Sequence, residues 1–175
     1  MDSTTINLSN YTMLIQYLME HNITVSTAES CSGGLISKLI TDIPGCSAIY
    51  PGGVCSYSNE MKMKWLNVKE TTLRQYGAVS AETAQEMAQG IRMATGSIYG
   101  ISTTGIAGPG GGSAEKPVGL VYIAIAGPDS CHAETLPLDP NIPLSRAEIQ
   151  QQAAVHALSL LWKTIRESNL YKKEV

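Results

Sequence analysis

Hydroxyls, a carboxylate, a thiol and two glycines are gathered in the segment TAESCSGG, residues Thr27–Gly34, where a short strand is expected to lead into a helix. A helix N-terminus carries free backbone amides and a positive dipole, so a turn of this kind can receive a phosphate or an oxyanion. The ordinary alternative is a helix N-cap supplied by Ser30 or Ser32, with Gly33 and Gly34 chosen for close packing. Spacing alone favours the N-cap.

A second candidate segment is the glycine-dense loop Gly105–Gly112, in which five of the eight residues are glycine. Its sequence has neither the GxxxxGK[ST] nor the GxGxxG order, so it does not indicate a nucleoside-triphosphate site. The loop could still line a pocket, with exposed amides against an anion and with Thr103 or Thr104 offering hydroxyls at the end of the preceding strand. A plain connection between strands is an equal alternative.

A lysine is the alternative candidate for a general base. Three histidines give no obvious serine triad, and no GxSxG elbow occurs. A lysine amine can take a proton from serine only if burial or nearby positive charge lowers its pKa. Lys62 follows a predicted strand and has apolar neighbours, which favours partial desolvation, although Lys62 and Lys64 as solvated helix residues are the common alternative. The SxxK string Ser113–Lys116 lies in a Gly/Pro loop and carries little weight.

Apolar spacing predicts the elements that must position these side chains. Ser80 and Ser145 are expected to cap two helices, and the second has an apolar face of Ala154, Leu158 and Leu161. Helices are predicted over Asn10–His21, Gly33–Ile43, around Lys62, from Ser80 to Gly96 and after Ser145, with strands over Ile23–Thr27, Val54–Tyr57, Ile98–Ser102, Val118–Ala126 and His132–Leu136. This mixture predicts a single layered α/β domain with a mixed sheet flanked by helices.

Length and composition limit the function classes. The 175 residues, 43% of them hydrophobic, fit one domain over 1–175, and we expect residues 1–9 and 169–175 to fray. A net charge of −3 lacks the basic surplus of a nucleic-acid binder. The longest apolar run is far shorter than the ~20 residues that span a bilayer, and no signal sequence occurs, which favours a cytoplasmic location without membrane contact. The four cysteines form no CxxC pair, so neither zinc nor a disulfide framework is indicated.

Five segments, taken in order, resemble the CinA C-terminal domain family, whose stand-alone members are nicotinamide-nucleotide amidases. The matching strings are TAESCSGG at Thr27, ITDIPGCSA ending at Ala48, YSNEMK at Tyr57, GAVS at Gly77 and GIAGPGGGSAEKPVG at Gly105. The likeness extends over nearly the whole chain, from about Tyr11 to Glu167. One short string would mean little, but five in the order of the family are specific.

The resemblance implies a serine–lysine dyad, with Ser47 as nucleophile and Lys62 as its base. Tyr57 would relay the proton or hold the lysine in place, and Cys46 is a rival nucleophile beside Ser47. Substrate-binding and oxyanion positions also carry over from the family, and they fall on Ser30, Thr104, Gly105, Gly108 and Arg146. Backbone amides near Ser47 would form the oxyanion hole together with a hydroxyl from this set.

The implied reaction is hydrolysis of the carboxamide of nicotinamide mononucleotide to nicotinate mononucleotide and ammonia, in pyridine-nucleotide salvage. The resemblance implies no metal or other cofactor, and it implies a homo-oligomer. The phosphate of the substrate would rest on the glycine-dense loop with Arg146 as a bidentate partner. Two other functions stay open, namely a non-catalytic nucleotide-binding or competence-associated module and an amidase that acts on another pyridine or nucleotide amide.

Overall fold

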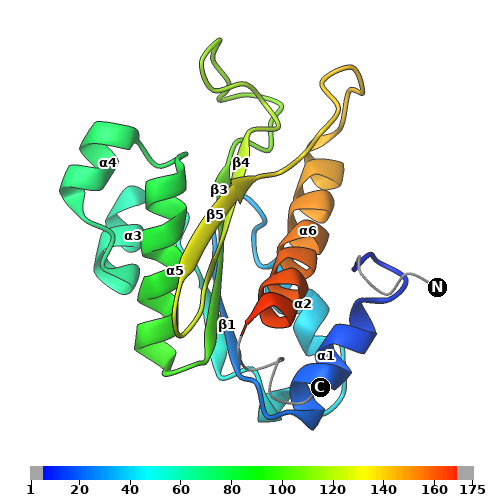
Figure 1. Ribbon diagram of the computed structural model, residues 1–175. Helices are drawn as coiled ribbons and strands as arrows, with labels where there is room; N and C mark the ends of the chain where they lie inside the picture. The colour runs from blue at the N-terminus through cyan, green and yellow to red at the C-terminus, as the bar shows by residue number, and fades with distance from the viewer. Residues whose placement is uncertain (1–5, 169–175) are drawn as a thin grey trace.

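The computed structural model describes residues 6–168, and within them five strands form one mixed sheet between two groups of helices (Figure 1). The strand order is β2-β1-β3-β4-β5, in which β1, β2 and β3 are parallel while β4 and β5 are each antiparallel to the preceding neighbour. The strands are β1 Val25–Glu29, β2 Gly52–Cys55, β3 Tyr99–Gly105, β4 Val121–Ala126 and β5 Cys131–Thr135. The predicted layered α/β fold is confirmed.

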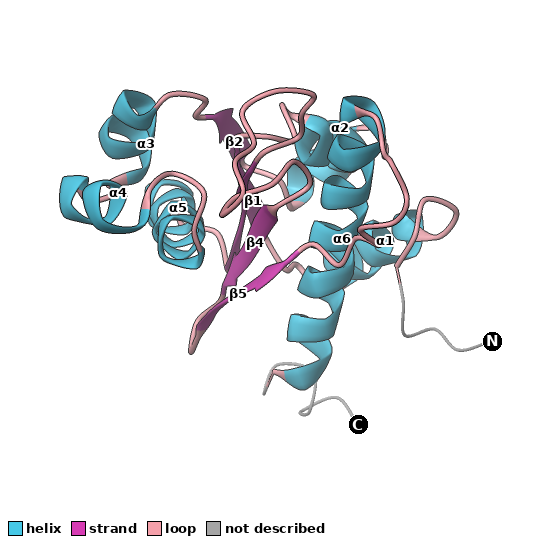
Figure 2. Cartoon of the chain, turned by 90° about the horizontal axis from the view of Figure 1, so that it is seen from above, coloured by secondary structure: helices cyan, strands magenta, loops and turns pink. Residues whose placement is uncertain are grey.

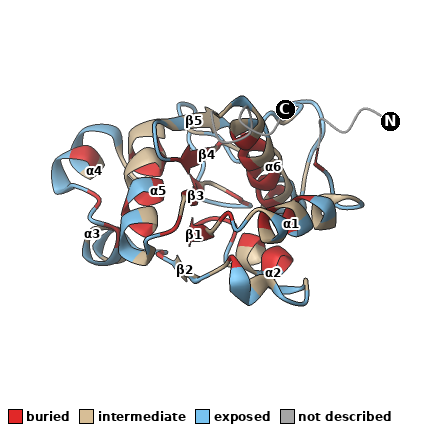
Figure 3. Ribbon diagram, turned by 60° about the horizontal axis from the view of Figure 1, so that its bottom comes forward, coloured by how far each residue is buried: buried red, intermediate tan, exposed pale blue. Residues whose placement is uncertain are grey.

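Each face of the sheet is covered by its own helices, as the view from above shows (Figure 2). One face carries α1 Tyr11–Glu20, α2 Leu35–Thr41 and α6 Arg146–Glu167, and the other carries α3 Asn59–Leu66, α4 Glu70–Tyr76 and α5 Ala81–Thr95. A short 3-10 helix, η1 Cys46–Ala48, precedes β2. Helix positions that face the sheet are buried and outward positions are exposed (Figure 3).

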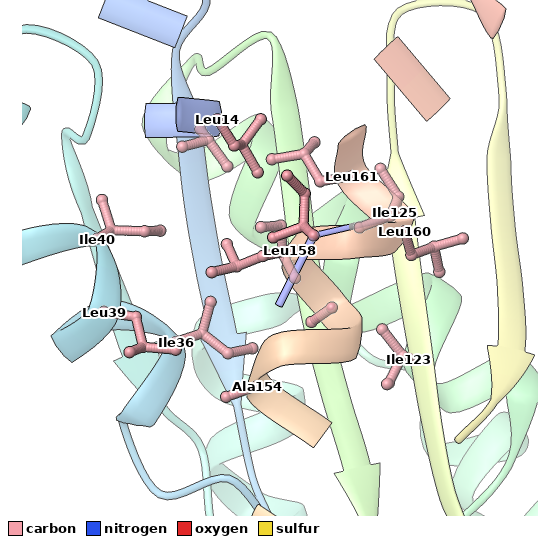
Figure 4. Close-up of a cluster of buried hydrophobic side chains, with 14 of the residues drawn as sticks. Leu14, Ile36, Leu39, Ile40, Ile123, Ile125, Ala154, Leu158, Leu160 and Leu161 are labelled. Carbon is pink, nitrogen blue, oxygen red and sulfur yellow. The ribbon is translucent and has the colours of Figure 1, made fainter. Parts of the chain in front are cut away.

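The larger core lies between the sheet and the α1, α2 and α6 layer (Figure 4). Leu158 and Leu161 of α6 are fully buried there, which confirms the predicted apolar face. The cap predictions are also confirmed, because the Ser80 hydroxyl accepts from the Thr83 amide and Ser145 forms a capping box with Glu148. Both long helices therefore begin where their sequences indicate.

The smaller core, on the other face, holds the element that carries Lys62. Leu66 of α3 packs with Ala28, Met87 and Ile91, and Lys62 is buried one turn before Leu66. Helix α3 lies so close to α5 that a Cβ at Gly90 would be 1.9 Å from the Leu66 carbonyl oxygen. This close packing fixes the α3 backbone, and with it the start of the Lys62 side chain.

Helix α4 was not predicted from the sequence. Thr72 is its single buried residue, so the helix has no stripe of apolar residues that would reveal it. Within residues 1–9, which were expected to fray, Ile6 is 5% exposed and packs in the larger core. The same expectation for residues 1–5 and 169–175 falls outside the described part of the chain. Over residues 6–168, none of the helices combines the length and the apolar character that crossing a bilayer requires.

Candidate active site

Ser30 and Lys62 meet at the carboxyl ends of the parallel strands, the end of the sheet that faces the viewer in Figure 2. Ser30 directly follows β1, and its amide donates to the Thr103 carbonyl of β3 at 3.0 Å. Lys62 reaches across from α3, and its Nζ lies 3.0 Å from the Ser30 Oγ. Ser30 is 8% exposed and Lys62 only 1%, so the pair is almost fully removed from water.

The Lys62 amine has polar but uncharged partners. Its Nζ donates to the Ser56 carbonyl at 2.7 Å and to the Tyr57 carbonyl at 3.4 Å, besides its contact with Ser30. Burial lowers the pKa of Lys62 from the usual 10.5 to about 8. At pH 7 roughly a tenth of the molecules then hold a neutral amine, which can accept the Ser30 proton.

Glu29 fixes the turn that carries Ser30. Its carboxylate is fully buried, and both oxygens accept hydrogen bonds from the start of α2. The donors are the Ser32 hydroxyl at 2.7 Å and the Gly34 amide at 2.9 Å, the Ile36 amide at 3.1 Å, and the Ser37 amide and hydroxyl at 2.8 and 2.6 Å. The carboxylate therefore occupies the anion position at this helix end. The sequence had offered a phosphate or oxyanion, or a serine N-cap, for this position, and the structure shows Glu29 there instead.

Replacing Glu29 by alanine is expected to lower the free energy of unfolding by on the order of 3 kcal/mol, because it leaves buried donors of α2 without an acceptor. Urea denaturation of the two proteins measures this difference. Glu20→Ala is the matched control, since Glu20 is an exposed carboxylate at the end of α1 and its loss should change stability by less than about 0.5 kcal/mol. Equal unfolding midpoints for the two variants would contradict the role given to Glu29.

The predicted pairing of Ser47 with Lys62 is wrong. Ser47 lies exposed in η1, and Ile49, two residues later, accepts from the amide of Val25 at the first position of β1. Ser30 follows the last position of the same strand, so about 16 Å of strand separates the two ends. Cys46, the rival nucleophile, lies with Ser47 at the far end. Within the described chain, the serine hydroxyl in contact with Lys62 is that of Ser30.

Tyr57, Arg146 and Gly108 form a second group beside the dyad. The Tyr57 side chain is 65% exposed, and its hydroxyl accepts from Arg146 Nη2 at 2.9 Å. Arg146 Nη1 donates to the Gly108 carbonyl at 2.8 Å, which ties the start of α6 to the glycine-dense loop. Tyr57 thus contacts Lys62 through its backbone carbonyl, while its hydroxyl is directed to Arg146.

Thr104 lies beside Ser30 on the neighbouring strand, because the register pairs Glu29 with Thr103. Its hydroxyl donates to the Ala78 carbonyl at 2.6 Å, so its proton is already committed and its free lone pairs can accept from an N–H. This differs from the expected role as an oxyanion donor. Gly105 has a packing role, since a Cβ there would be 2.6 Å from the Leu120 carbonyl oxygen.

Two further groups are excluded as reactive centres. Burial raises the pKa of the Cys31 thiol to about 11, so this neighbour of Ser30 stays protonated and is a poor nucleophile. The amine of Lys116, from the SxxK string, donates to the carbonyls of Tyr76 at 2.7 Å and Val79 at 2.8 Å. These bonds tie the Ser113–Lys116 segment to the end of α4 and the residues after it, so the amine donates to backbone carbonyls.

Glu29 was not predicted as a helix cap, and Ser56 was not predicted as a site residue. A carboxylate between a buried strand and a run of small residues is a signal for a buried helix cap, because these residues offer hydroxyls and amides but no cation. Ser56 gives no such signal, since its part in the site follows from the fold of the chain between β2 and α3. Ser30 was included, but as a binding residue.

Comparison with known proteins gives matches over most of the chain. A model of the CinA C-terminal domain matches residues 9–165. A competence-damage inducible protein of Caldanaerobacter subterraneus is 48% identical over 149 residues, which cover 85% of this chain and 35% of that protein. A CinA-like protein of Leptospira interrogans is 48% identical over 153 residues, which cover 87% of this chain and 36% of that protein. The chain thus spans about a third of the length of these curated relatives.

Solved structures match the fold as well. The competence/damage inducible protein CihA of Agrobacterium tumefaciens has a TM-score of 0.81 at 39% identity, covering 86% of this chain and 90% of its own. A CinA superfamily protein of Klebsiella pneumoniae has a TM-score of 0.84 at 28% identity, and the match covers 93% of this chain and 99% of that protein's chain. The arrangement of helices and sheet described above is therefore shared with these proteins.

Proposed function

Because this chain belongs to the CinA C-terminal domain family, we propose that it is an amidohydrolase that removes ammonia from nicotinamide mononucleotide, with Ser30 as nucleophile and Lys62 as base. The single observation that carries the proposal is the buried contact of 3.0 Å between Lys62 Nζ and Ser30 Oγ. A serine amidase whose serine is not paired with a histidine needs another base, and a lysine amine with a lowered pKa beside the serine hydroxyl can supply it.

The reaction begins with proton transfer from the Ser30 hydroxyl to neutral Lys62 while the Oγ attacks the carboxamide carbon. The electron pair of the C=O bond moves onto oxygen, and the tetrahedral intermediate forms. Its collapse breaks the C–N bond, and the Lys62 ammonium gives its proton to the departing nitrogen, which leaves as ammonia. Water then hydrolyses the acyl-enzyme, with the same amine as base, and releases the carboxylate product.

Neighbouring groups are suited to hold the substrate. Thr104 lies next to Ser30 with lone pairs that can accept from the substrate amide N–H. Arg146 has two neutral acceptors, the Gly108 carbonyl and the Tyr57 hydroxyl, and a phosphate would make stronger charge-assisted bonds with its guanidinium. We therefore place the phosphate at Arg146 and the glycine-dense loop, and the pyridine carboxamide at Ser30.

Arg146→Gln is expected to lower kcat/KM for nicotinamide mononucleotide by about 10- to 100-fold, because one charge-assisted bond to the phosphate is lost. Turnover of nicotinamide riboside, which has no phosphate, should be nearly unchanged in the same variant. Steady-state ammonia release with both substrates measures the two effects. Equal losses on the two substrates would argue against a phosphate site at Arg146.

The proposal itself is tested by measuring ammonia release from nicotinamide, its riboside and its mononucleotide with the purified chain. We expect the mononucleotide to be the best substrate. Binding of the mononucleotide without release of ammonia would instead support a non-catalytic nucleotide-binding module. Release from a different amide alone would keep the dyad but change the substrate. Assembly into a homo-oligomer stays a prediction, which light scattering can check.

A further inference from the structure

Two buried hydroxyls in residues 6–168 have no hydrogen-bond partner in the protein, those of Ser56 and Tyr99. Ser56 is fully buried. A buried hydroxyl without a partner costs stability, so a protein rarely keeps one without a reason. The two differ in position, because Tyr99 is the first residue of β3, where it pairs with Val25 at the far end of the sheet, whereas Ser56 lies in the candidate active site.

The Ser56 hydroxyl lies on the face of the sheet from which Lys62 approaches. Strand side chains alternate between faces, and Val54, two residues earlier, packs against the smaller core, which contains Leu66 of α3. The ladder continues through Ser56, whose amide donates to the Glu29 carbonyl at 2.9 Å. The Ser56 carbonyl accepts from Lys62 Nζ at 2.7 Å, so the buried amine lies against the residue that carries the unpaired hydroxyl.

From this placement we infer that Ser56 is a positioning residue, whose hydroxyl accepts a hydrogen bond from Lys62 after Ser30 has been acylated. The inference rests on the proposed amidase function and adds one residue to its second half-reaction. In the free enzyme the Ser30 Oγ is a partner of Lys62. In the acyl-enzyme this oxygen is part of an ester and is a much weaker acceptor. The Ser56 hydroxyl takes its place.

The consequence is specific to deacylation. A neutral amine has two N–H groups and one lone pair, and only the lone pair can take a proton from water. One N–H donates to the Ser56 carbonyl, and the other is shared between the Tyr57 carbonyl, a long contact of 3.4 Å, and the Ser56 hydroxyl, so the lone pair is left free for the attacking water. Acylation does not need this hydroxyl, because the Ser30 hydroxyl itself faces the lone pair in that step.

The experiment is a steady-state comparison of wild type with Ser56→Ala, using nicotinamide mononucleotide. Slower deacylation leaves kcat/KM unchanged, because kcat/KM reports on acylation, the step that releases ammonia, and it lowers kcat and KM by the same factor when deacylation limits turnover. We expect the rate constant of deacylation, followed as the loss of acyl-enzyme after the substrate is exhausted, to fall about tenfold, the effect of losing one hydrogen bond in the transition state. Mass spectrometry of the quenched variant should show acyl-enzyme accumulating.

Stability separates this role from a structural one. Ser56→Ala removes an unpaired buried hydroxyl, so its midpoint of thermal unfolding should not fall. Tyr99→Phe is the matched control, because it removes the other unpaired hydroxyl, far from the dyad, and should leave kcat and KM unchanged. Ser56→Thr keeps the hydroxyl and should restore kcat.

Three results would overturn the inference. An unchanged rate constant of acyl-enzyme loss in Ser56→Ala would show that deacylation does not use the hydroxyl. A fall in kcat/KM together with a lower unfolding midpoint would show a structural role. If wild type released no ammonia from any of the amides, the proposed function would fail and this inference with it, whereas an active wild type with an unaffected Ser56→Ala variant would refute this inference alone.

Discussion

Replacing Ser30 by alanine should reduce ammonia release by roughly 10⁴-fold or more, because the reaction loses its nucleophile and with it the covalent route. The hydroxyl removed is the one that lies 3.0 Å from Lys62 Nζ. Ser47→Ala should keep nearly full activity, since Ser47 is exposed in η1 near the opposite end of β1. The assay is steady-state release of ammonia from nicotinamide mononucleotide.

The two serine variants act as controls for each other. Both replace a hydroxyl by a hydrogen, and neither serine belongs to the apolar cores, so both proteins should fold and unfold much as wild type does. Circular dichroism and thermal unfolding establish this point before activity is compared. Full activity in Ser30→Ala, or loss of activity in Ser47→Ala alone, would contradict Ser30 as the nucleophile and would place the nucleophile in η1.

The second large effect is expected at Lys62. Only the neutral amine accepts a proton, so kcat/KM should rise about tenfold per pH unit below the pKa of Lys62, which is about 8, and level off above it. Lys62→Met should lower the rate by about 10²- to 10⁴-fold and remove this pH dependence. Lys62→Arg keeps a positive charge but does not deprotonate, so it should be equally inactive. A rate that is flat from pH 6 to 9 in wild type would contradict Lys62 as base.

The lowered pKa also has a measurable effect on stability. In the unfolded chain Lys62 returns to its usual pKa of 10.5, so between pH 8 and 10.5 the unfolded state binds more protons than the folded state. The free energy of unfolding of wild type, relative to Lys62→Met, should therefore rise with pH across this window by up to about 3 kcal/mol. Below pH 8 the amine is protonated in both states and the difference stays constant. Urea denaturation at pH 7 and pH 10 measures this change.

Much of the fold was predictable because its helices and strands carry their own signals. Ser145 was predicted as the N-cap of α6, to which the structure adds the capping box with Glu148, and the apolar face that contains Leu158 predicted its buried side. Strand order was not predictable, since it depends on which faces pack together and not on the sequence of any one strand. Helix α4 escaped detection because it buries little and so has no apolar period.

The candidate site was predictable in its residues but not in its pairing. Ser30, Tyr57 and Arg146 were all included, and the structure gathers them around Lys62 and the glycine-dense loop. The choice of Ser47 as nucleophile came from the likeness of a motif, which does not say at which end of β1 a residue lies. Only the parallel register of β1 with β2 and β3 decides that question.

The most direct measurement is to locate the covalent intermediate. Enzyme mixed with nicotinamide mononucleotide is quenched during the first turnover, digested and examined by peptide mass spectrometry. The proposed mechanism predicts an acyl group on the Ser30 side chain, and its absence when Lys62 is replaced by methionine. An acyl group on Ser47 or Cys31, or ammonia released at the full rate by the Ser30→Ala enzyme, would contradict the account.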